Sequence, residues 1–235
     1  MTSRKHPILC PALLALAVLA AGFTTDCFPQ TTATNLQAKA SRFQNEIEAF
    51  ERSDRTNPPP QGATLFIGSS SIALWKTLAQ DFPGHRVINR GFGGSQLIDS
   101  VNYAERIVLP YQPKRIVLYA GGNDINEGKS PQQVLADYRA FVAKVQAALP
   151  ATRIAYISIA PNPARWAQVD KVREANRLIE DYARQHPQLS FINVFPRMLG
   201  TDELPQPDLF GPDRLHMSPK GYALWKELVG PFLEE

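Results

Sequence analysis

The chain has 235 residues, of which 44% are hydrophobic and 20% charged. This composition excludes a disordered chain and a coiled coil, and the length suits one domain better than two. The formal net charge is only +3, and the Lys and Arg residues are scattered rather than gathered in a basic stripe. We therefore expect no binding to nucleic acid.

The beginning of the chain is typical of a secretory signal. Residues 4–6 are basic, the run 8–21 is apolar, and the small residues 20–22 form a candidate cleavage site. The apolar run contains Pro11 and is shorter than the roughly 18 residues that a membrane-spanning helix needs, which disfavours an uncleaved anchor. We expect residues 1–22 to be a signal peptide and the mature protein to be exported, periplasmic or extracellular, with no stable membrane insertion.

Two cysteines bear on the same question. Cys10 lies within the predicted signal, so Cys27 is the one that remains, and a single cysteine cannot form an internal disulfide. Lipid attachment at Cys27 would give a lipoprotein. Asp26 stands where the lipid-attachment motif has a small residue, so we expect no lipid anchor.

Residues 23–60 are expected to form a flexible Thr-rich tail, an amphipathic helix and a Pro-rich linker. The helix is predicted for about 36–55, because apolar residues share one of its faces. These residues are Phe43, Ile47 and Phe50. Three prolines in 57–60 end the helix and stiffen the linker. We expect the helix to pack on the outside of a main domain that spans 61–235.

Short β-branched runs then alternate with sequence of helical period. The expected strands are Thr64–Ile67, Arg86–Ile88, Arg115–Tyr119, Arg153–Ile159 and Phe191–Val194. The clearest helix begins at Ser130-Pro131, and its apolar stripe runs from Val134 to Leu149. Repeated strand–helix–strand units predict an α/β fold with a five-stranded parallel sheet and helices on both faces.

Polar residues follow four of the expected strands. In a parallel sheet the ligand site lies at the carboxyl ends of the strands, so these residues should converge on one edge. The four blocks are Gly68–Ser71, Asn89–Ser95, Gly121–Asp124 and Asp213–His216. Together they supply hydroxyl, amide, carboxylate and imidazole groups.

These groups suit nucleophilic catalysis. A serine hydroxyl attacks well once a base accepts its proton, and the usual base is a histidine held by a carboxylate. His216 lies in a polar loop after the last strand, with Asp213 three residues before it, whereas His85 precedes a strand and His186 ends a helix. A spacing of three can place both side chains on one side of a turn. We expect Asp213 to orient His216, and His216 to activate a serine after the first strand.

An oxyanion that develops during acyl transfer needs hydrogen-bond donors aimed at it. Gly94 offers a backbone N–H without a side chain in the way, and Asn123 offers a neutral amide. The N–H of the nucleophile, at the start of the next helix, is a third candidate.

Other chemistries fit less well. The glycine loop at 91–94 lacks the last glycine of the dinucleotide fingerprint, and no phosphate-binding Walker pattern occurs. Residues 124–128 lack the ligand spacing and closing glutamate of a calcium loop, so we expect no metal. The nucleophile elbow of the other large α/β hydrolase fold is also missing. Taken alone, Ser70 would be read as a helix cap.

The four blocks, in this order, resemble the SGNH hydrolases, also called GDSL esterases or lipases. The sequence looks closest to the branch that includes platelet-activating-factor acetylhydrolase catalytic subunits and many bacterial acylhydrolases. The resemblance covers nearly all of residues 64–230. It implies a flavodoxin-like three-layer α/β/α sandwich, no cofactor, and esters, thioesters or acetylated sugars as substrates.

The resemblance also implies roles for particular residues. The family's nucleophile falls on Ser70, whose N–H then joins the oxyanion hole. The other oxyanion donors fall on Gly94 and Asn123, and the Asp-x-x-His pair falls on Asp213 and His216.

One position departs from the family pattern. The aspartate that precedes the family's nucleophile is replaced by Ser69, inside a run of three serines. Ser69 and Ser71 are therefore rivals to Ser70, although the register of the block favours Ser70.

Four residues within or beside these blocks are candidates for binding substrate: Arg90, Phe92, Asn126 and Trp166. The function that we expect is an exported serine esterase acting on short, acetyl-type esters, with esters of carbohydrates as one candidate substrate class. The alternatives are a lipolytic acylhydrolase or lysophospholipase, a thioesterase, and, from another functional class, a catalytically silent carbohydrate-binding module on the same fold.

Overall fold

The computed structural model describes residues 1–2 and 42–234. The rest of the predicted signal peptide, Cys27 and the tail up to residue 41 lie outside the described residues. Among the residues that are described, no helix is long and apolar enough to cross a membrane.

Five strands form one parallel sheet in the order β2-β1-β3-β4-β5. They are β1 (Thr64–Gly68), β2 (Val87–Gly91), β3 (Arg115–Tyr119), β4 (Arg153–Ile157) and β5 (Leu189–Ile192). This is the flavodoxin-like strand order, in which the direction of winding reverses between β1 and β3. The predicted α/β fold with a five-stranded parallel sheet is confirmed.

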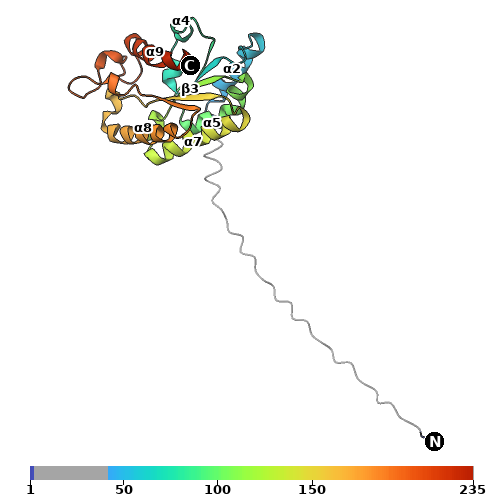
Figure 1. Cartoon of the computed structure of the whole chain (residues 1–235). Coiled ribbons are helices and arrows are strands. Elements are labelled where there is room, and N and C mark those ends of the chain that lie inside the picture. Colours follow the sequence, from blue (N-terminus) through green and yellow to red (C-terminus); the bar gives the residue numbers. More distant parts are fainter. Residues whose placement is uncertain (3–41, 235) are drawn as a thin grey trace.

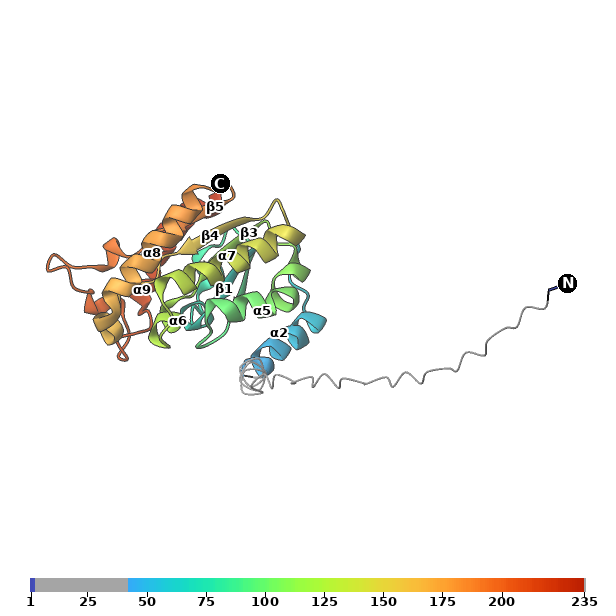
Figure 2. The same ribbon diagram turned by 90° about the horizontal axis from the view of Figure 1, so that it is seen from below.

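Helices cover both faces of the sheet (Figures 1 and 2). On one face lie α5 (Leu97–Ile107), α7 (Pro131–Ala148) and α8 (Val169–Arg184), with α2 (Gln44–Thr56) beside α5. The other face carries α3 (Ser70–Ala73), α4 (Leu78–Asp81) and α9 (Pro219–Glu234). The short α6 (Gly122–Asn126) follows β3, and η2 (Pro163–Gln168) precedes α8.

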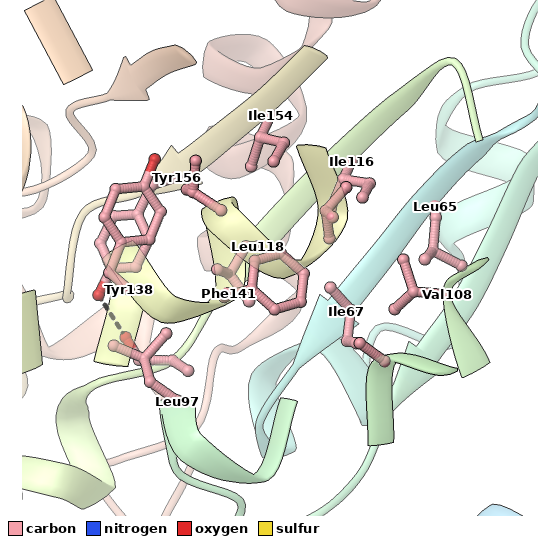
Figure 3. Close-up of a cluster of buried hydrophobic side chains, with 14 of the residues drawn as sticks. Leu65, Ile67, Leu97, Val108, Ile116, Leu118, Tyr138, Phe141, Ile154 and Tyr156 are labelled. Atoms are coloured by element: carbon pink, nitrogen blue, oxygen red, sulfur yellow. Dashed lines mark hydrogen bonds between the residues drawn. The ribbon is translucent and has the colours of Figure 1, made fainter. Parts of the chain in front are cut away.

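The core is divided by the sheet into two apolar clusters. Successive residues of a strand point to opposite faces, so Leu65 and Ile67 pack under α5 and α7, while Phe66 packs under α9. Figure 3 shows the first cluster, where Phe141 of α7 lies over side chains of the sheet. Because β1 is buried on both faces, it appears in the sequence as a continuous apolar run.

The β2 strand is longer than the sequence predicts. It continues to Gly91, whereas the expected strand ends at Ile88. Asn89 makes this possible because its side chain donates to the carbonyl of Ile72 at 2.7 Å and accepts from the N–H of Gly91 at 2.9 Å. The polar side chain is thus satisfied within the sheet, and the glycine loop begins only at Phe92.

The last two strands are also displaced from their predicted limits. β4 ends at Ile157, two residues before the expected end, and β5 occupies 189–192 rather than 191–194. The Ser158 hydroxyl accepts from the N–H groups of Val194 and Phe195, at 3.0 and 3.2 Å. This side-chain contact replaces the strand pairing that the sequence predicts for those residues.

Of the two predicted helices, the one that starts at Ser130-Pro131 is present, and the 36–55 helix is described only from residue 42 onward. α7 begins as predicted: Ser130 accepts from the N–H of Gln133 at 3.2 Å, and the Gln133 side chain accepts from the N–H of Ser130 at 2.8 Å. The described part of the predicted 36–55 helix is α2. Its Ile47 is fully buried and belongs to the same core cluster as the residues of α5 and α7.

Candidate active site

The candidate site lies at the switch point of the sheet. Ser70 begins α3 directly after β1, and Asn123 lies in α6 directly after β3. Because β1 and β3 are neighbours in the sheet, their carboxyl ends bring these two residues to the same edge.

A close approach between two strands determines how the chain leaves β1. Gly68 has φ of +135°, and a Cβ placed on it would lie only 1.8 Å from the carbonyl oxygen of Tyr119 at the end of β3. The next N–H, that of Ser69, donates to the same carbonyl at 2.9 Å. Only glycine fits this backbone conformation and this spacing, so Gly68 allows the sharp turn that places Ser70 at the start of α3.

Three side chains form a continuous hydrogen-bonded chain. The Oγ of Ser70 lies 2.8 Å from Nε2 of His216, and Nδ1 of His216 lies 2.6 Å from Oδ2 of Asp213. The other carboxylate oxygen of Asp213 accepts from the N–H groups of Leu215 and His216, each at 3.0 Å. The carboxylate therefore holds both the ring and the backbone of the loop that carries it.

These hydrogen bonds set the charge of Asp213. The bond from the His216 side chain, with the bonds from the two backbone N–H groups, lowers the pKa of Asp213 to about 2. The carboxylate is thus ionised at neutral pH and can accept a hydrogen bond from Nδ1–H of His216. With Nδ1 as a donor, Nε2 of the neutral ring is free to accept from the Ser70 hydroxyl.

The rival serines do not share this arrangement. Ser69 and Ser71 are buried, with 6% and 5% of their surfaces exposed, and among the serines that the structure describes only Ser70 has its hydroxyl hydrogen-bonded to His216. The two other described histidines have different partners: His85 contacts Glu234, and His186 contacts the carbonyl of Tyr182.

Three N–H donors are available beside Ser70. Within residues 42–234, neither the backbone N–H of Ser70 nor that of Gly94 has a hydrogen-bond acceptor. The Nδ2 of Asn123 donates to the carbonyl of Ser95 at 3.0 Å, which leaves its second N–H free. Because Ser95 directly follows Gly94, this bond ties the amide of Asn123 to the glycine loop. Such a group of donors suits a developing oxyanion.

A buried carboxylate also joins the glycine loop after β2 to the loop after β3. Asp124 is fully buried, and its oxygens accept from the N–H of Leu97 at 3.2 and 3.3 Å and from Nζ of Lys129 at 2.8 Å. Burial raises the pKa of Asp124, against the lowering effect of Lys129. Asp124 thus links α6 to the first residue of α5, and so holds Asn123 in place relative to Gly94.

Arg165 is a residue that the sequence prediction missed. Its Nη1 donates to Oδ1 of Asn123 at 3.0 Å and to the carbonyl of Gly122 at 3.1 Å. The adjacent Ala164 N–H donates to the carbonyl of Arg214, inside the loop of Asp213 and His216, at 3.1 Å. The sequence signal for this contact is weak: Arg165 merely lies in a polar loop after the fourth strand.

Two of the four predicted substrate-binding residues are not brought to the triad. Arg90 forms an ion pair with Asp54 of α2 at 2.5 Å, and its Nε donates to the Tyr111 hydroxyl at 2.9 Å. Phe92 is only 1% exposed and packs edge-on against Phe43, with ring centroids 5.1 Å apart. Both side chains serve the packing of α2, so the expected role in a substrate pocket is not supported for either.

The other two candidates lie closer to the triad loops. Asn126 is exposed at the end of α6, three residues after Asn123. Trp166 lines an open groove of about 570 Å³ together with Arg214 of the Asp213–His216 loop. The groove also has the polar residues Thr201, Asp202 and Gln206 in its wall. Within the described residues, no cluster of three or more His, Cys, Asp or Glu side chains could hold a metal ion.

Comparison with known proteins identifies a family. The model of the GDSL-like lipase/acylhydrolase family matches residues 62–224, which include every residue of the triad and of the predicted oxyanion hole. No curated protein matches the sequence of this chain.

Solved structures of low sequence identity share the fold. A Streptococcus pneumonia protein named as a platelet activating factor is 21% identical, with a TM-score of 0.73, and the match covers 88% of this chain and 100% of that one. A GDSL-like lipase from Bacteroides thetaiotaomicron is 21% identical (TM-score 0.67; 84% and 98% covered). An acetyl-xylooligosaccharide esterase from Geobacillus Stearmophilus, solved as a mutant, is 15% identical (TM-score 0.60; 75% and 96% covered).

The turn after β1 generates a prediction. Replacing Gly68 by Ala should lower the free energy of unfolding by about 3 kcal/mol, because the methyl group meets the Tyr119 carbonyl and the residue must keep a positive φ. Urea unfolding of the purified variant measures this change. The matched control is Gly84→Ala, whose methyl group would have no atom within 4 Å. Equal stability of the two variants would show that the turn is not constrained in this way.

Proposed function

Because the chain belongs to the GDSL-like lipase/acylhydrolase family, we propose that it is a serine ester hydrolase. The observation that carries this proposal is the line of contacts from Ser70 Oγ to His216 Nε2 and from His216 Nδ1 to Asp213 Oδ2. It supplies a nucleophile, a base for its proton and a carboxylate that orients the base.

In the acylation step, Ser70 Oγ attacks the ester carbonyl carbon while Nε2 of His216 accepts the hydroxyl proton. The carbonyl electrons move to oxygen, and the N–H groups of Ser70 and Gly94 and the Asn123 amide donate to this oxyanion. His216 then gives its proton to the leaving alkoxide as the carbon–oxygen bond breaks. Asp213 stabilises the imidazolium that forms between these two proton transfers.

In the second half of the reaction, water attacks the acyl-Ser70 intermediate. His216 accepts a proton from this water and returns one to Ser70 Oγ as the carboxylic acid leaves. The acyl-enzyme is hydrolysed through the same oxyanion donors, so one set of residues serves both halves.

Substitution of Ser70 and of its neighbour Ser69 tests which serine is the nucleophile. We expect Ser70→Ala to abolish hydrolysis of p-nitrophenyl acetate, because no other hydroxyl contacts His216 among the described residues. Ser69→Ala is the matched control, and we expect it to keep activity within about threefold because Ser69 has no contact with His216. Release of p-nitrophenol is followed by absorbance. Activity of Ser70→Ala at the wild-type level would overturn the proposal.

The low pKa of Asp213 generates a prediction for pH dependence. A carboxylate with a pKa of about 2 keeps its charge as pH falls through about 4, where an ordinary aspartate is about half protonated. The acid side of the kcat/KM profile should therefore have a slope of about 1, because Asp213 adds no protonation step of its own in this range. We expect Asp213→Asn to lower kcat on the order of 10⁴-fold across the profile. An additional acid-side loss near pH 4 in the wild type would contradict this account.

For the substrate, we propose a short acyl ester of a carbohydrate. The groove beside the catalytic loop combines an aromatic ring, Trp166, with polar groups such as Asp202 and Gln206. Its volume of about 570 Å³ is sufficient for a small sugar, whose apolar faces stack on aromatic rings while its hydroxyls bind polar groups. One of the solved structures with this fold is named as an acetyl-xylooligosaccharide esterase.

Trp166 provides the test of the substrate class. We expect Trp166→Ala to raise KM for an acetylated xylo-oligosaccharide roughly 10-fold, the equivalent of one aromatic contact of ~1.4 kcal/mol. KM and kcat for p-nitrophenyl acetate should stay within about twofold, because this small ester does not reach the groove. Trp166→Phe, which keeps a ring, should retain most of the affinity.

Assays of the wild type on long-chain esters, lysophospholipids and thioesters, beside the acetylated sugar, test the alternative substrates. A preference of the wild type for long-chain esters, lysophospholipids or thioesters over the acetylated sugar would contradict the carbohydrate assignment and leave the serine mechanism intact. We also propose export, on the charge and apolar pattern of residues 1–22.

A further inference from the structure

Arg165 is a half-buried cation at the rim of the candidate oxyanion hole. Both of its hydrogen bonds come from Nη1, and both acceptors belong to the loop after β3: Oδ1 of Asn123 at 3.0 Å and the carbonyl of Gly122 at 3.1 Å. Within residues 42–234, no carboxylate forms an ion pair with it. Burial lowers the pKa of Arg165, and the nearby negative charge of Glu127 offsets only part of this effect.

The contact fixes which end of the Asn123 amide faces the arginine. A guanidinium has only donors, so the amide oxygen must face it and the amide nitrogen must face away. On the other side, Nδ2 donates to the carbonyl of Ser95. If the amide were flipped, its NH₂ group would face the N–H donors of Arg165 and its oxygen would face the carbonyl oxygen of Ser95. Neither hydrogen bond could then form. The two contacts together therefore select the orientation in which an amide N–H is available to the reacting carbonyl.

The charge acts through the same contact. A cation on the oxygen end of an amide draws electron density toward that oxygen, which makes the N–H groups at the other end stronger donors. The hydrogen bond to the guanidinium is charge-assisted, so it holds the side chain more firmly than a neutral bond would. The gain is realised when negative charge develops on the substrate oxygen, that is, in the transition state.

The segment that carries Arg165 is itself anchored on the catalytic loop. The N–H of Ala164 donates to the carbonyl of Arg214, between Asp213 and His216. Asn162 also caps this segment, because its Oδ1 accepts from the backbone N–H of Arg165 at 2.9 Å. The guanidinium is thus presented by a backbone whose position is tied to the base of the reaction.

We propose that Arg165 is a positioning residue of the oxyanion hole, and that its guanidinium holds the Asn123 amide with an N–H directed at the ester carbonyl. The inference rests on the proposed serine ester hydrolysis and extends it by one residue that acts on the substrate only through Asn123. A different role, in which Arg165 binds an anionic group of the substrate directly, is separated by the experiment below.

The test is a double-mutant cycle with Arg165→Met and Asn123→Ala, measured on p-nitrophenyl acetate. We expect Asn123→Ala to lower kcat by 10²–10³-fold, as for other oxyanion donors. Arg165→Met alone should lower kcat by roughly 10-fold or more while KM stays within about threefold. When Asn123 is already Ala, Arg165→Met should cost less than about twofold, because the group through which it acts is gone.

Additive effects in the cycle would overturn the inference. So would a rise in KM as the main effect of Arg165→Met, or a loss confined to negatively charged esters, both of which indicate direct binding of substrate. Ser70→Ala, measured in parallel, separates failure of the proposed function from failure of the role of Arg165. If Ser70→Ala is active, the proposed function is wrong. If Ser70→Ala is inactive and the effects of Arg165→Met and Asn123→Ala are additive, only the role of Arg165 is wrong.

Two controls keep the test independent of folding. Arg177→Met removes an exposed arginine of α8 that pairs with Glu174, and it should leave kcat unchanged. Arg165→Lys keeps the charge and a donor, so it should recover part of the kcat that Arg165→Met loses. If Arg165→Met unfolds, the cycle is measured with Arg165→Lys, and additivity of that variant with Asn123→Ala overturns the inference equally.

Discussion

The close approach of β1 and β3 at their carboxyl ends is the constraint on which the site depends. The Tyr119 carbonyl occupies the space that a side chain on Gly68 would need, and it accepts the N–H of Ser69. The chain must therefore turn out of the sheet at this point, and it does so into the first turn of α3. Ser70 emerges at the switch point, with its backbone N–H unbonded among the described residues and its hydroxyl facing His216.

The remaining parts of the site reach this point from the ends of the other four strands, and several of them are joined by polar contacts. Asn123 binds the carbonyl of Ser95, and Asp124 binds the N–H of Leu97, so the loops after β2 and β3 are held together twice. Arg165 adds the loop after β4 through the Asn123 amide. Prearranged donors of this kind need little reorganisation as charge develops, which is the main physical requirement of an oxyanion hole.

The sequence was sufficient to predict the sheet and the residues that gather at the switch point. Strands buried on both faces leave continuous apolar runs, and the Asp213–His216 pair is local, because a spacing of three already brings the two side chains to one turn. Arg165 could not be found in this way. Its contact joins residues 42 positions apart, and neither periodicity nor a local motif records such a pairing.

The positions of Arg90 and Phe92 differ from the expectation because β2 is longer than the sequence predicts. A strand that ended at Ile88 would leave both residues in a loop beside the site. In the structure β2 continues to Gly91, and the ion pair of Arg90 with Asp54 and the packing of Phe92 on Phe43 belong to the attachment of α2. That helix lies far away in the sequence, so its partners cannot be identified from local pattern.

Covalent labelling tests the central claim most directly. An alkyl fluorophosphonate reacts with an activated serine: the serine oxygen attacks phosphorus, fluoride leaves, and the phosphonate stays on the side chain. Mass-spectrometric peptide mapping of the wild type should place the label on Ser70, with none on Ser69 or Ser71, and His216→Ala should react far more slowly. A label on another residue, or an undiminished rate without His216, would contradict the account.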